Sequence, residues 1–261
     1  MEIDAPPSWR CVDFISDLHL QAPDARTFEA WRQYLLHTTA DAIFILGDLF
    51  EVWVGDDIVS NTLTFESQCA QVIHQATQKT KVFIMHGNRD FLMGLALMQA
   101  CNAMLLDDPT VLTFGGQRWL LTHGDALCLE DTSYQVFRAK VRGDVWQKAF
   151  LSKTLHERQS IASDIRAQSE THKRAESTYA DLDTAAVIEA LRDSHAVHMI
   201  HGHTHRPGLH LLGQGLERIV LSDWDACAQP PRAEVLRISV NTQGNSTVWR
   251  LTPANATKPQ N

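Results

Sequence analysis

Five short polar motifs in this 261-residue chain carry side chains that are able to bind a metal ion. Each motif follows directly on a short apolar run. The motifs are rich in carboxylate, amide and imidazole groups, which are the usual protein ligands of divalent ions. In chain order they are Ser16-Asp17-Leu18-His19, Gly47-Asp48-Leu49-Phe50-Glu51, His86-Gly87-Asn88-Arg89-Asp90, His123-Gly124-Asp125 and His201-Gly202-His203-Thr204-His205.

The spacing within the motifs supports joint binding of an ion. Asp17 and His19 are two residues apart, and so are His203 and His205. In extended backbone such side chains point to the same side, so that each pair is able to grip one ion. Glycines beside the other candidates permit tight turns and a close approach of backbone to a ligand. The full candidate set is Asp17, His19, Asp48, Asn88, His123, His203 and His205.

Seven oxygen and nitrogen ligands are too many for one tetrahedral ion and suit two octahedral ions that also bind water. Because the set contains no thiolate, Mn²⁺, Fe²⁺ or Zn²⁺ fits it better than a soft metal. Two ions need a bridging carboxylate, and Asp48 is the natural choice. Among the thirteen histidines, His86 is expected in the supporting layer or the core, while a ligand role for His201 stays open.

The elements that position these motifs are predicted from the apolar pattern. Cys11–Ile15, Ala42–Leu46 and Lys81–Met85 have the composition of buried strands, and Thr27–His37 and Leu63–Gln78 between them have helical spacing. This alternation predicts an α/β fold with a largely parallel sheet, in which ligands bind beyond the carboxyl ends of the strands. The five motifs would therefore meet in one crevice. Further strands are predicted at Val111–Phe114, Arg118–Thr122, Val197–Ile200, Arg218–Leu221, Val235–Val240 and Thr247–Leu251.

Residues 134–174 interrupt this pattern with apolar residues at every third or fourth position, which predicts a helical insertion. The insertion carries nine Lys or Arg against four Asp or Glu, a net charge of +5 that leaves −13 for the rest. This excess of positive charge favours an anionic partner for the insertion. The alternative is a solvated helical face on which Lys and Arg outnumber Asp and Glu by chance. We expect a core over residues 10–130 and 184–252, a helical cap over 131–183, and a disordered tail over 253–261.

Composition excludes several classes of protein. No stretch approaches the roughly 18–20 apolar residues of a membrane helix, and the first residues lack the features of a secretory signal. A net charge of −8 argues against a dedicated duplex-DNA binder. The five cysteines never form a C-x-x-C pair, as expected of reduced thiols. We expect a cytoplasmic protein with no nucleic-acid partner, and no obligatory protein partner is evident.

The order of the motifs, D-x-H, G-D, G-N-[RH]-[DE], H and G-H-x-H, resembles that of the calcineurin-like metallophosphoesterase superfamily. The resemblance spans roughly residues 14–205 and leaves no ligand position unfilled. It implies an α/β sandwich of two mixed β-sheets flanked by helices, with a two-metal site at the strand ends. It assigns one ion to Asp17, His19, Asp48 and His205, and the other to Asp48, Asn88, His123 and His203.

A narrower resemblance rests on a longer block, Gly-Asp-Leu-Phe-Glu-Val-Trp-Val-Gly-Asp-Asp at residues 47–57. Together with residues 86–92, 123–128 and 134–138, this block is similar to the UDP-2,3-diacylglucosamine pyrophosphatases, a family of lipid A synthesis in Gram-negative bacteria. That family splits its lipid-linked UDP-sugar into UMP and 2,3-diacylglucosamine 1-phosphate (lipid X). The resemblance implies two Mn²⁺ per chain and a helical insertion that caps the acyl chains.

The same resemblance implies which residues contact the substrate. After Ser169 the chain departs from the family pattern, and Lys173 or Arg174 is the candidate cation for the glucosamine phosphate. The complete predicted set of substrate contacts is Asn88, Arg89, Asp131, Ser169, Lys173, Arg174 and His203.

For the reaction, we predict in-line attack of a metal-bridging hydroxide on the UMP-side (α) phosphorus. Arg89 would hold non-bridging oxygens bidentately. His203, or His123 through a water, would protonate the leaving phosphate. With Asn88, these residues form the predicted catalytic group.

The cap is expected to contribute binding rather than chemistry. Trp146, Phe150, Leu151 and Leu155 are candidates to line an acyl cleft, and simple packing of the lobe is the alternative for each. Basic residues of the cap are expected to meet anionic headgroups at about 1 kcal/mol each. This predicts peripheral association with the cytoplasmic face of the inner membrane.

Two other functions stay open from the sequence. The same metal site would also serve a protein phosphatase, a cyclic-nucleotide phosphodiesterase or a nuclease. A non-catalytic scaffold with this fold is the rival from another class, although such a protein would be expected to have lost ligands.

Overall fold

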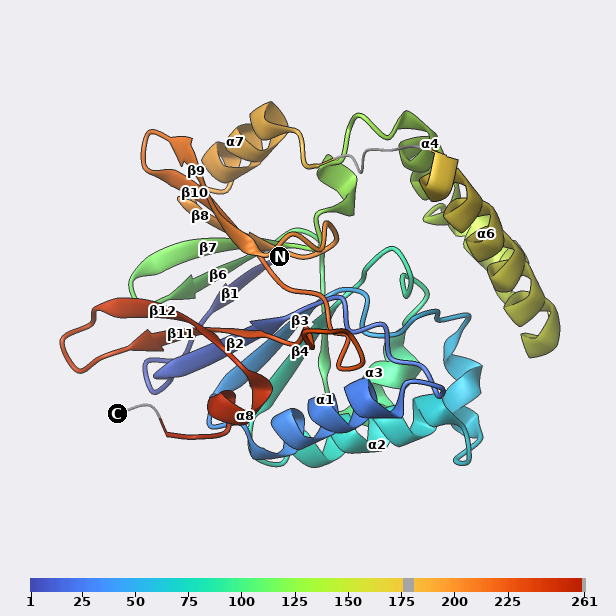
Figure 1. Cartoon of the computed structure of the whole chain (residues 1–261), viewed down its shortest axis with the longest axis horizontal. Coiled ribbons are helices and arrows are strands. Elements are labelled where there is room, and N and C mark those ends of the chain that lie inside the picture. The colour runs from blue at the N-terminus through green and yellow to red at the C-terminus, as the bar shows by residue number, and fades with distance from the viewer. Residues whose placement is uncertain (176–180, 260–261) are drawn as a thin grey trace.

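The computed structural model describes residues 1–175 and 181–259, with side chains described for 1–167 and 181–259. Within these residues two six-stranded sheets lie face to face between layers of helices (Figure 1). One sheet has the order β1 (Glu2–Asp4), β6 (Thr110–Phe114), β7 (Gln117–Thr122), β8 (His198–His201), β10 (Leu216–Val220) and β9 (Gly208–Gly213). The other has the order β12 (Ser246–Leu251), β11 (Val235–Val240), β2 (Cys11–Ile15), β3 (Ala42–Leu46), β4 (Lys81–Met85) and β5 (Met104–Leu106).

Both sheets are mixed. Strands β2, β3, β4 and β5 run parallel, whereas β11 pairs antiparallel with β2. In the other sheet β7, β8 and β10 are parallel, with antiparallel neighbours β6 and β9 at either side. The parallel arrangement predicted from strand–helix alternation is confirmed for β2, β3 and β4, and the antiparallel strands β11 and β12 make their sheet mixed. The two mixed sheets implied by the resemblance are also confirmed.

The strands form because their apolar residues fill two faces at once. In β3, Phe44 points into the core between the sheets, and Ile43 and Ile45 point toward the helices. Phe44 stacks on Phe14 and Phe83 at centroid distances of 5.2 and 4.7 Å, which joins three neighbouring strands. Strands buried on both faces are expected to be almost continuously apolar, as these are.

Helices cover the outer faces of both sheets. Helices α1 (Ala25–His37), α2 (Phe65–Ala76) and α3 (Leu95–Cys101) pack below the second sheet, and α7 (Thr184–Asp193) lies on the first (Figure 1). Three of them begin at a side-chain cap: Asp24, Thr64 and Asp183 each accept a hydrogen bond from a backbone N–H of the first turn. Short 3₁₀ turns lie at η1 (Asp56–Ser60) and η2 (Asp125–Leu127).

The predicted insertion is helical, as α4 (Thr132–Val141), α5 (Asp144–Leu151) and α6 (Leu155–Ala175) confirm. These helices lie beyond one end of the strands, at the right of Figure 1. The block of residues 47–57 provides an attachment for α6. The guanidinium of Arg158 in α6 is buried, donates to the carbonyl of Val54 and pairs with the carboxylate of Asp57.

The chain end differs from the disordered tail predicted from Pro253. Residues 253–256 form a short helix, α8 (Pro253–Ala256), which contacts α1, and Ala256 is fully buried. The carbonyl of Ala256 accepts a 2.7 Å hydrogen bond from Nη2 of Arg237. A tertiary contact with a residue of β11 therefore orders a segment whose own composition is polar. Residues 260 and 261 lie outside the described part.

Arg237 is itself held by a buried ion pair. Its Nε and Nη2 atoms lie 2.7 and 2.8 Å from the two carboxylate oxygens of Asp13. The hydroxyls of Tyr34 and Thr38 each donate to the same carboxylate at 2.9 Å. The pair is therefore fully hydrogen-bonded, which is the condition for burying two charges without a large penalty.

Replacing Arg237 by Met should lower the free energy of unfolding by about 3–5 kcal/mol, because Asp13 would stay buried without its partner. The measurement is urea denaturation followed by circular dichroism. Arg32→Met is the control: this arginine pairs with Glu29 on the exposed face of α1, and the midpoint should barely move. Equal effects of the two substitutions would contradict the assignment.

Candidate metal centre

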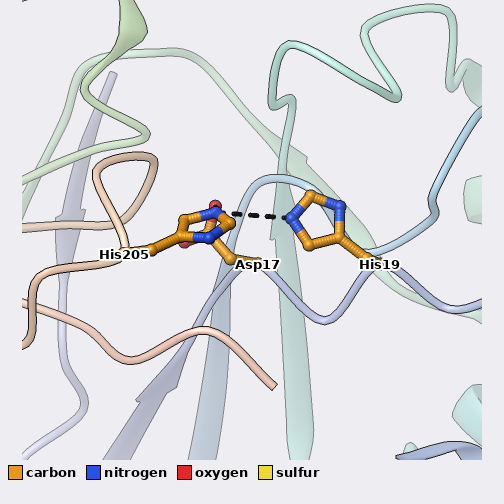
Figure 2. Close-up of side chains that lie close together, drawn as sticks. All are labelled: Asp17, His19 and His205. Carbon is orange, nitrogen blue, oxygen red and sulfur yellow. Dashed lines mark hydrogen bonds and ion pairs between the residues drawn. The ribbon is translucent and has the colours of Figure 1, made fainter. Parts of the chain in front are cut away.

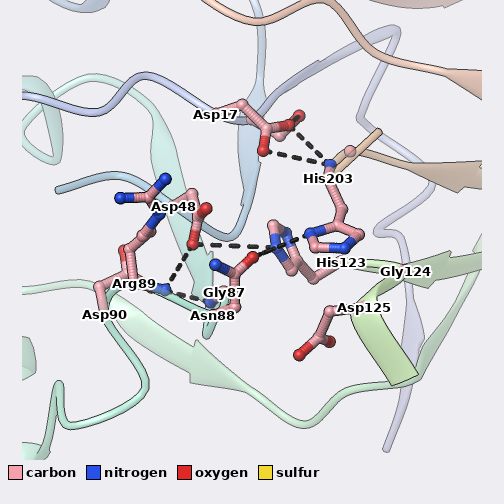
Figure 3. A network of polar contacts seen from close by, with 12 residues as sticks. Asp17, Asp48, Gly87, Asn88, Arg89, Asp90, His123, Gly124, Asp125 and His203 are labelled. Carbon is pink, nitrogen blue, oxygen red and sulfur yellow. Dashed lines mark hydrogen bonds and ion pairs between the residues drawn. The ribbon is translucent and has the colours of Figure 1, made fainter. Parts of the chain in front are cut away.

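The five motifs meet where strands of both sheets end. Three follow β2, β3 and β4 of one sheet, and two follow β7 and β8 of the other. All seven predicted ligands lie in one continuous set of contacts there, shown in two parts by Figures 2 and 3. Neither sheet alone carries the whole set.

The first group consists of Asp17, His19 and His205, whose ligand atoms all lie within 4.8 Å of one another. Nε2 of His19 is 3.4 Å from Nε2 of His205, and the latter is 3.3 Å from Oδ1 of Asp17. Figure 2 shows the two imidazoles turned toward each other. Two ring nitrogens and a carboxylate aimed at one small volume are arranged as ligands of a cation.

The second group is centred on Asn88. Its Oδ1 lies 3.0 Å from Nε2 of His123 and 2.8 Å from Nδ1 of His203 (Figure 3). Asp48 stands between the two groups, because its Oδ2 is 3.9 Å from Nε2 of His19 and its Oδ1 is 3.8 Å from Nε2 of His123. This geometry suits a bridging carboxylate. Asp17 also reaches the second group, since Asp17, Asp48 and His123 form a second possible metal cluster.

The backbone of this site is strained. Among the described residues, eight other than glycine have a positive φ angle, and five of these are predicted ligands. Such conformations cost about 1–3 kcal/mol each and persist where the surrounding structure requires them. The five are Asp17, His19, Asp48, His203 and His205, with φ between 48° and 67°. These conformations lower the stability of the fold but direct the side chains into the site, as expected of a binding site.

Glycines allow the strands' ends to come close. A Cβ on Gly87 would overlap the carboxylate and backbone of Asp48, and one on Gly202 would overlap Asp17. A Cβ on Gly47 would lie 2.5 Å from Nδ1 of His123. The predicted close approach of backbone at these glycines is confirmed.

The electrostatics of the site separate its histidines. Burial opposes protonation of His123, but the nearby carboxylates of Asp48, Asp17 and Asp125 outweigh it and raise its pKa to about 9. For His203, burial and the charge of His123 lower the pKa to about 4. Burial also opposes ionisation of Asp17, yet a hydrogen bond from His205 and the charge of His123 bring its pKa well below the usual range. The buried carboxylates thus demand positive charge, which is what a divalent ion provides.

Outer groups hold several ligands in place. Nδ1 of His19 is 2.9 Å from Oε2 of Glu51, and Nδ1 of His205 is 3.8 Å from Oδ2 of Asp223. The Ser16 hydroxyl donates to Asp17 at 2.6 Å. A carboxylate at the distance of Glu51 favours one tautomer and direction of a metal-binding imidazole, whereas Asp223 is too far from His205 for a hydrogen bond and acts on it only through its charge. Sequence reasoning missed Glu51 and Asp223 as site residues, although Glu51 belongs to a motif that it quoted.

Asp90 supports two of the loops at once. Its carboxylate accepts hydrogen bonds from the backbone N–H groups of Gly87, Leu49 and Phe50 at 2.8, 2.7 and 3.3 Å. Burial, reinforced by the charge of Asp48, raises the pKa of Asp90 to about 7. This residue ties the loop after β3 to the loop after β4 and thereby sets the distance between their ligands.

The two remaining histidines of the motifs, His86 and His201, lie outside both groups of predicted ligands. His86 is partly buried, with Nε2 2.6 Å from the carbonyl of Met93, which agrees with the predicted supporting role. His201 is fully buried, with Nδ1 2.8 Å from the carbonyl of Gly202, and it contributes no atom to the groups described.

The predicted substrate contacts are spread more widely. Arg89 lies at the edge of the centre, with Nη1 3.5 Å from Oε1 of Glu51. Asp131 caps α4, accepting from the backbone N–H of Tyr134 at 2.9 Å. The other three fall on the last turns of α6, where side chains lie outside the described residues: Ser169, Lys173 and Arg174.

Helix α4 is tied directly to this centre through Asp125. The carboxylate of Asp125 accepts from the Tyr134 hydroxyl at 2.5 Å and from Nε of Arg138 at 2.8 Å. The ring of Tyr134 stacks 6.1 Å from that of His203. The cap therefore begins at the metal ligands themselves rather than on a remote surface.

Comparison with known proteins agrees with this geometry. Residues 12–207 match the calcineurin-like phosphoesterase family. The chain belongs to that family. The resemblance found in the motif order is thereby confirmed.

Several relatives match nearly their whole length. The UDP-2,3-diacylglucosamine hydrolase of Shewanella pealeana is 43% identical, covering 81% of this chain and 89% of its own. Proteins of the same name from Bordetella pertussis and Chromobacterium violaceum are 41% and 45% identical, covering 83% and 82% of this chain and 87% and 90% of their own. Among solved structures, a Vps29 single mutant from Entamoeba histolytica is 12% identical with a TM-score of 0.47, covering 92% of this chain and 98% of its own.

Within the described residues, no helix has the length and apolar character needed to cross a membrane.

Asp48→Asn should lower the number of bound divalent ions from about two per chain to one or none, because a neutral amide bridges two cations poorly. Metal content after dialysis against Mn²⁺ is the measurement. Asp107→Asn, a change in an exposed carboxylate, is the control and should bind like the unmodified chain. Full metal content in Asp48→Asn would refute the bridging role.

Proposed function

We propose that this protein hydrolyses the pyrophosphate bond of UDP-2,3-diacylglucosamine to UMP and 2,3-diacylglucosamine 1-phosphate, a step in lipid A synthesis. The observation that carries the proposal is the 41–45% identity to hydrolases of this name over more than 80% of the chain. Support comes from the seven predicted ligands, which lie together at one end of the sheets, and from the helical insertion beside them.

The donor set fits two divalent ions, which we propose to be Mn²⁺. It is mixed oxygen and nitrogen, contains no thiolate, and converges from two groups that share Asp48. Ions bound there would neutralise pyrophosphate charge and lower the pKa of a water. The residues around these side chains would hold them in the orientation that binds the ions.

Residues at the edge of the centre would handle the substrate. The Arg89 guanidinium is partly exposed and has the planar fork that matches two phosphate oxygens. If Nδ1 of His203, the nitrogen that faces Asn88, held a metal ion through its lone pair, the proton of the neutral imidazole would lie on Nε2, which would then be able to donate it to the leaving phosphate. His123, acting through a water, is the second candidate acid.

Hydrolysis in H₂¹⁸O with Mn²⁺ tests both the substrate and the bond cleaved. Attack at the α-phosphorus should place the label in UMP and leave the lipid phosphate unlabelled. Label in the lipid product would overturn this choice of phosphorus. Hydrolysis of a phosphopeptide or a cyclic nucleotide without turnover of the UDP-lipid would instead favour another metallophosphoesterase activity. If none of these three substrates is hydrolysed, the result would favour a non-catalytic scaffold protein.

We propose that the acyl chains bind under the cap and that the cap meets the membrane. Phe150 packs into the protein core, so the simple packing interpretation holds for that residue. Leu151, Val136 and Val145 on the cap are 44%, 72% and 85% exposed. Each buried CH₂ of an acyl chain would contribute about 0.8 kcal/mol to binding. Cations of the same lobe would add attraction to anionic headgroups.

Peripheral association at the cytoplasmic face of the inner membrane follows from this proposal. Sedimentation with vesicles containing anionic phospholipid should pull down the protein at low salt and release most of it at high salt. Vesicles of neutral phospholipid serve as the control and should bind less. Binding that is absent, or equal on both vesicles at all salt concentrations, would contradict the proposal.

A further inference from the structure

Glu51 lies where the metal centre, Arg89 and the cap come together. It follows β3, and its side chain is only 15% exposed. Its Oε2 is 2.9 Å from Nδ1 of His19, and its Oε1 is 3.5 Å from Nη1 of Arg89. Oε1 also pairs with Nη2 of Arg166, a residue of α6. One carboxylate thus contacts a metal ligand and a cap helix at the same time.

The contact with His19 determines how that ring faces a metal. A carboxylate 2.9 Å from Nδ1 favours the neutral tautomer whose proton lies on Nδ1, and this tautomer leaves Nε2 as the lone-pair donor. Nε2 is the nitrogen that faces His205 and Asp48. Displacing Glu51 would free the ring to turn and would weaken the first group.

The contact with Arg166 holds helix α6 of the cap to the carboxylate of Glu51. Nη1 of Arg166 also lies 3.4 Å from the backbone carbonyl of Glu51. A second polar attachment of α6 is the buried Arg158, which binds Asp57 and the Val54 carbonyl, and apolar residues such as Ile161 also pack against the core. The Arg158 attachment contacts no predicted metal ligand, so it differs from the Arg166 contact in what it is able to transmit.

We propose that Glu51 is a positioning residue that couples the placement of α6 to metal binding at His19. A coupling between two sites is reciprocal: if α6 helps to hold Glu51 on His19, then metal binding at His19 must also stabilise α6. This inference requires a metal ion at His19 and does not depend on the identity of the lipid substrate.

Metal titration by calorimetry tests one direction of the coupling. Glu51→Gln should weaken Mn²⁺ binding by about 10–100-fold, the usual loss when the outer partner of a metal-binding histidine is removed. Asp57→Asn is the matched control, because it neutralises the carboxylate of the other α6 anchor and should leave Mn²⁺ affinity unchanged. Wild-type affinity in Glu51→Gln, or an equal loss in both variants, would overturn the proposal.

Hydrogen–deuterium exchange of residues 155–167 tests the reverse direction. Mn²⁺ should slow exchange there in the wild type and in Asp57→Asn, and should have little effect in Glu51→Gln. If Mn²⁺ does not change the exchange rate of α6 in the wild type, the proposed coupling is overturned. Thermal unfolding of the metal-free variants shows whether each one folds.

Arg166→Met keeps the test decisive even if Glu51→Gln fails to fold. It removes the cap side of the contact and leaves the carboxylate beside His19 intact. Coupling predicts at least about a fivefold loss of Mn²⁺ affinity, the lower end of the usual range for linked sites. Unchanged affinity would show that the cap and the metal centre are independent.

Discussion

Two carboxylates buried beside each other are the constraint on which the rest of this structure depends. Asp17 and Asp48 are 0% and 2% exposed, and with His123 their ligand atoms lie within 4.8 Å of one another. Two like charges out of water repel strongly and each loses its hydration. Such a pair is tolerated only where positive charge and hydrogen-bond donors surround it. Here His123, whose pKa is raised to about 9, lies beside both carboxylates, and the backbone N–H groups of His203 and Arg89 donate to them.

Asp17 joins the two sheets at the site, and Asp48 joins two neighbouring strand ends within one sheet. Asp17 follows β2 of one sheet, yet both of its oxygens accept from the backbone N–H of His203, which follows β8 of the other, at 3.1 and 2.9 Å. Asp48 likewise accepts from the N–H of Arg89 across two neighbouring strands at 2.8 Å. The ligands are therefore part of the framework that aims them. This explains why five of them persist in left-handed conformations.

A feature of the structure could be predicted from the sequence when residues close together in the chain determine it, and could not when it depends on contacts between distant segments. Strands such as Ala42–Leu46 and Lys81–Met85 were predictable to the residue, because uninterrupted apolar runs bounded by turn residues are a local signal. The antiparallel pairing of β11 with β2 was not, because it joins strands more than two hundred residues apart in the sequence. The ordering of α8 was missed for the same reason, since Arg237 acts from β11. The candidate ligands could be grouped from the sequence because spacing within motifs is local. The contact of Glu51 with Arg166 could not, because α6 lies more than a hundred residues away in the sequence.

The longer block of residues 47–57 shows how a metal centre is joined to a cap. Trp53 donates through its indole to Asp56, whose carboxylate also accepts from the backbone N–H groups of Gly94 and Leu97 at 2.9 and 3.0 Å. A Cβ at Gly55, where φ is 134°, would overlap the Arg158 guanidinium. The block therefore needs glycine and acidic residues for docking α6, independently of any metal. Its first half carries the predicted ligand Asp48 and its second half contacts α6, so a single stretch of eleven residues links the candidate metal centre to the helical insertion.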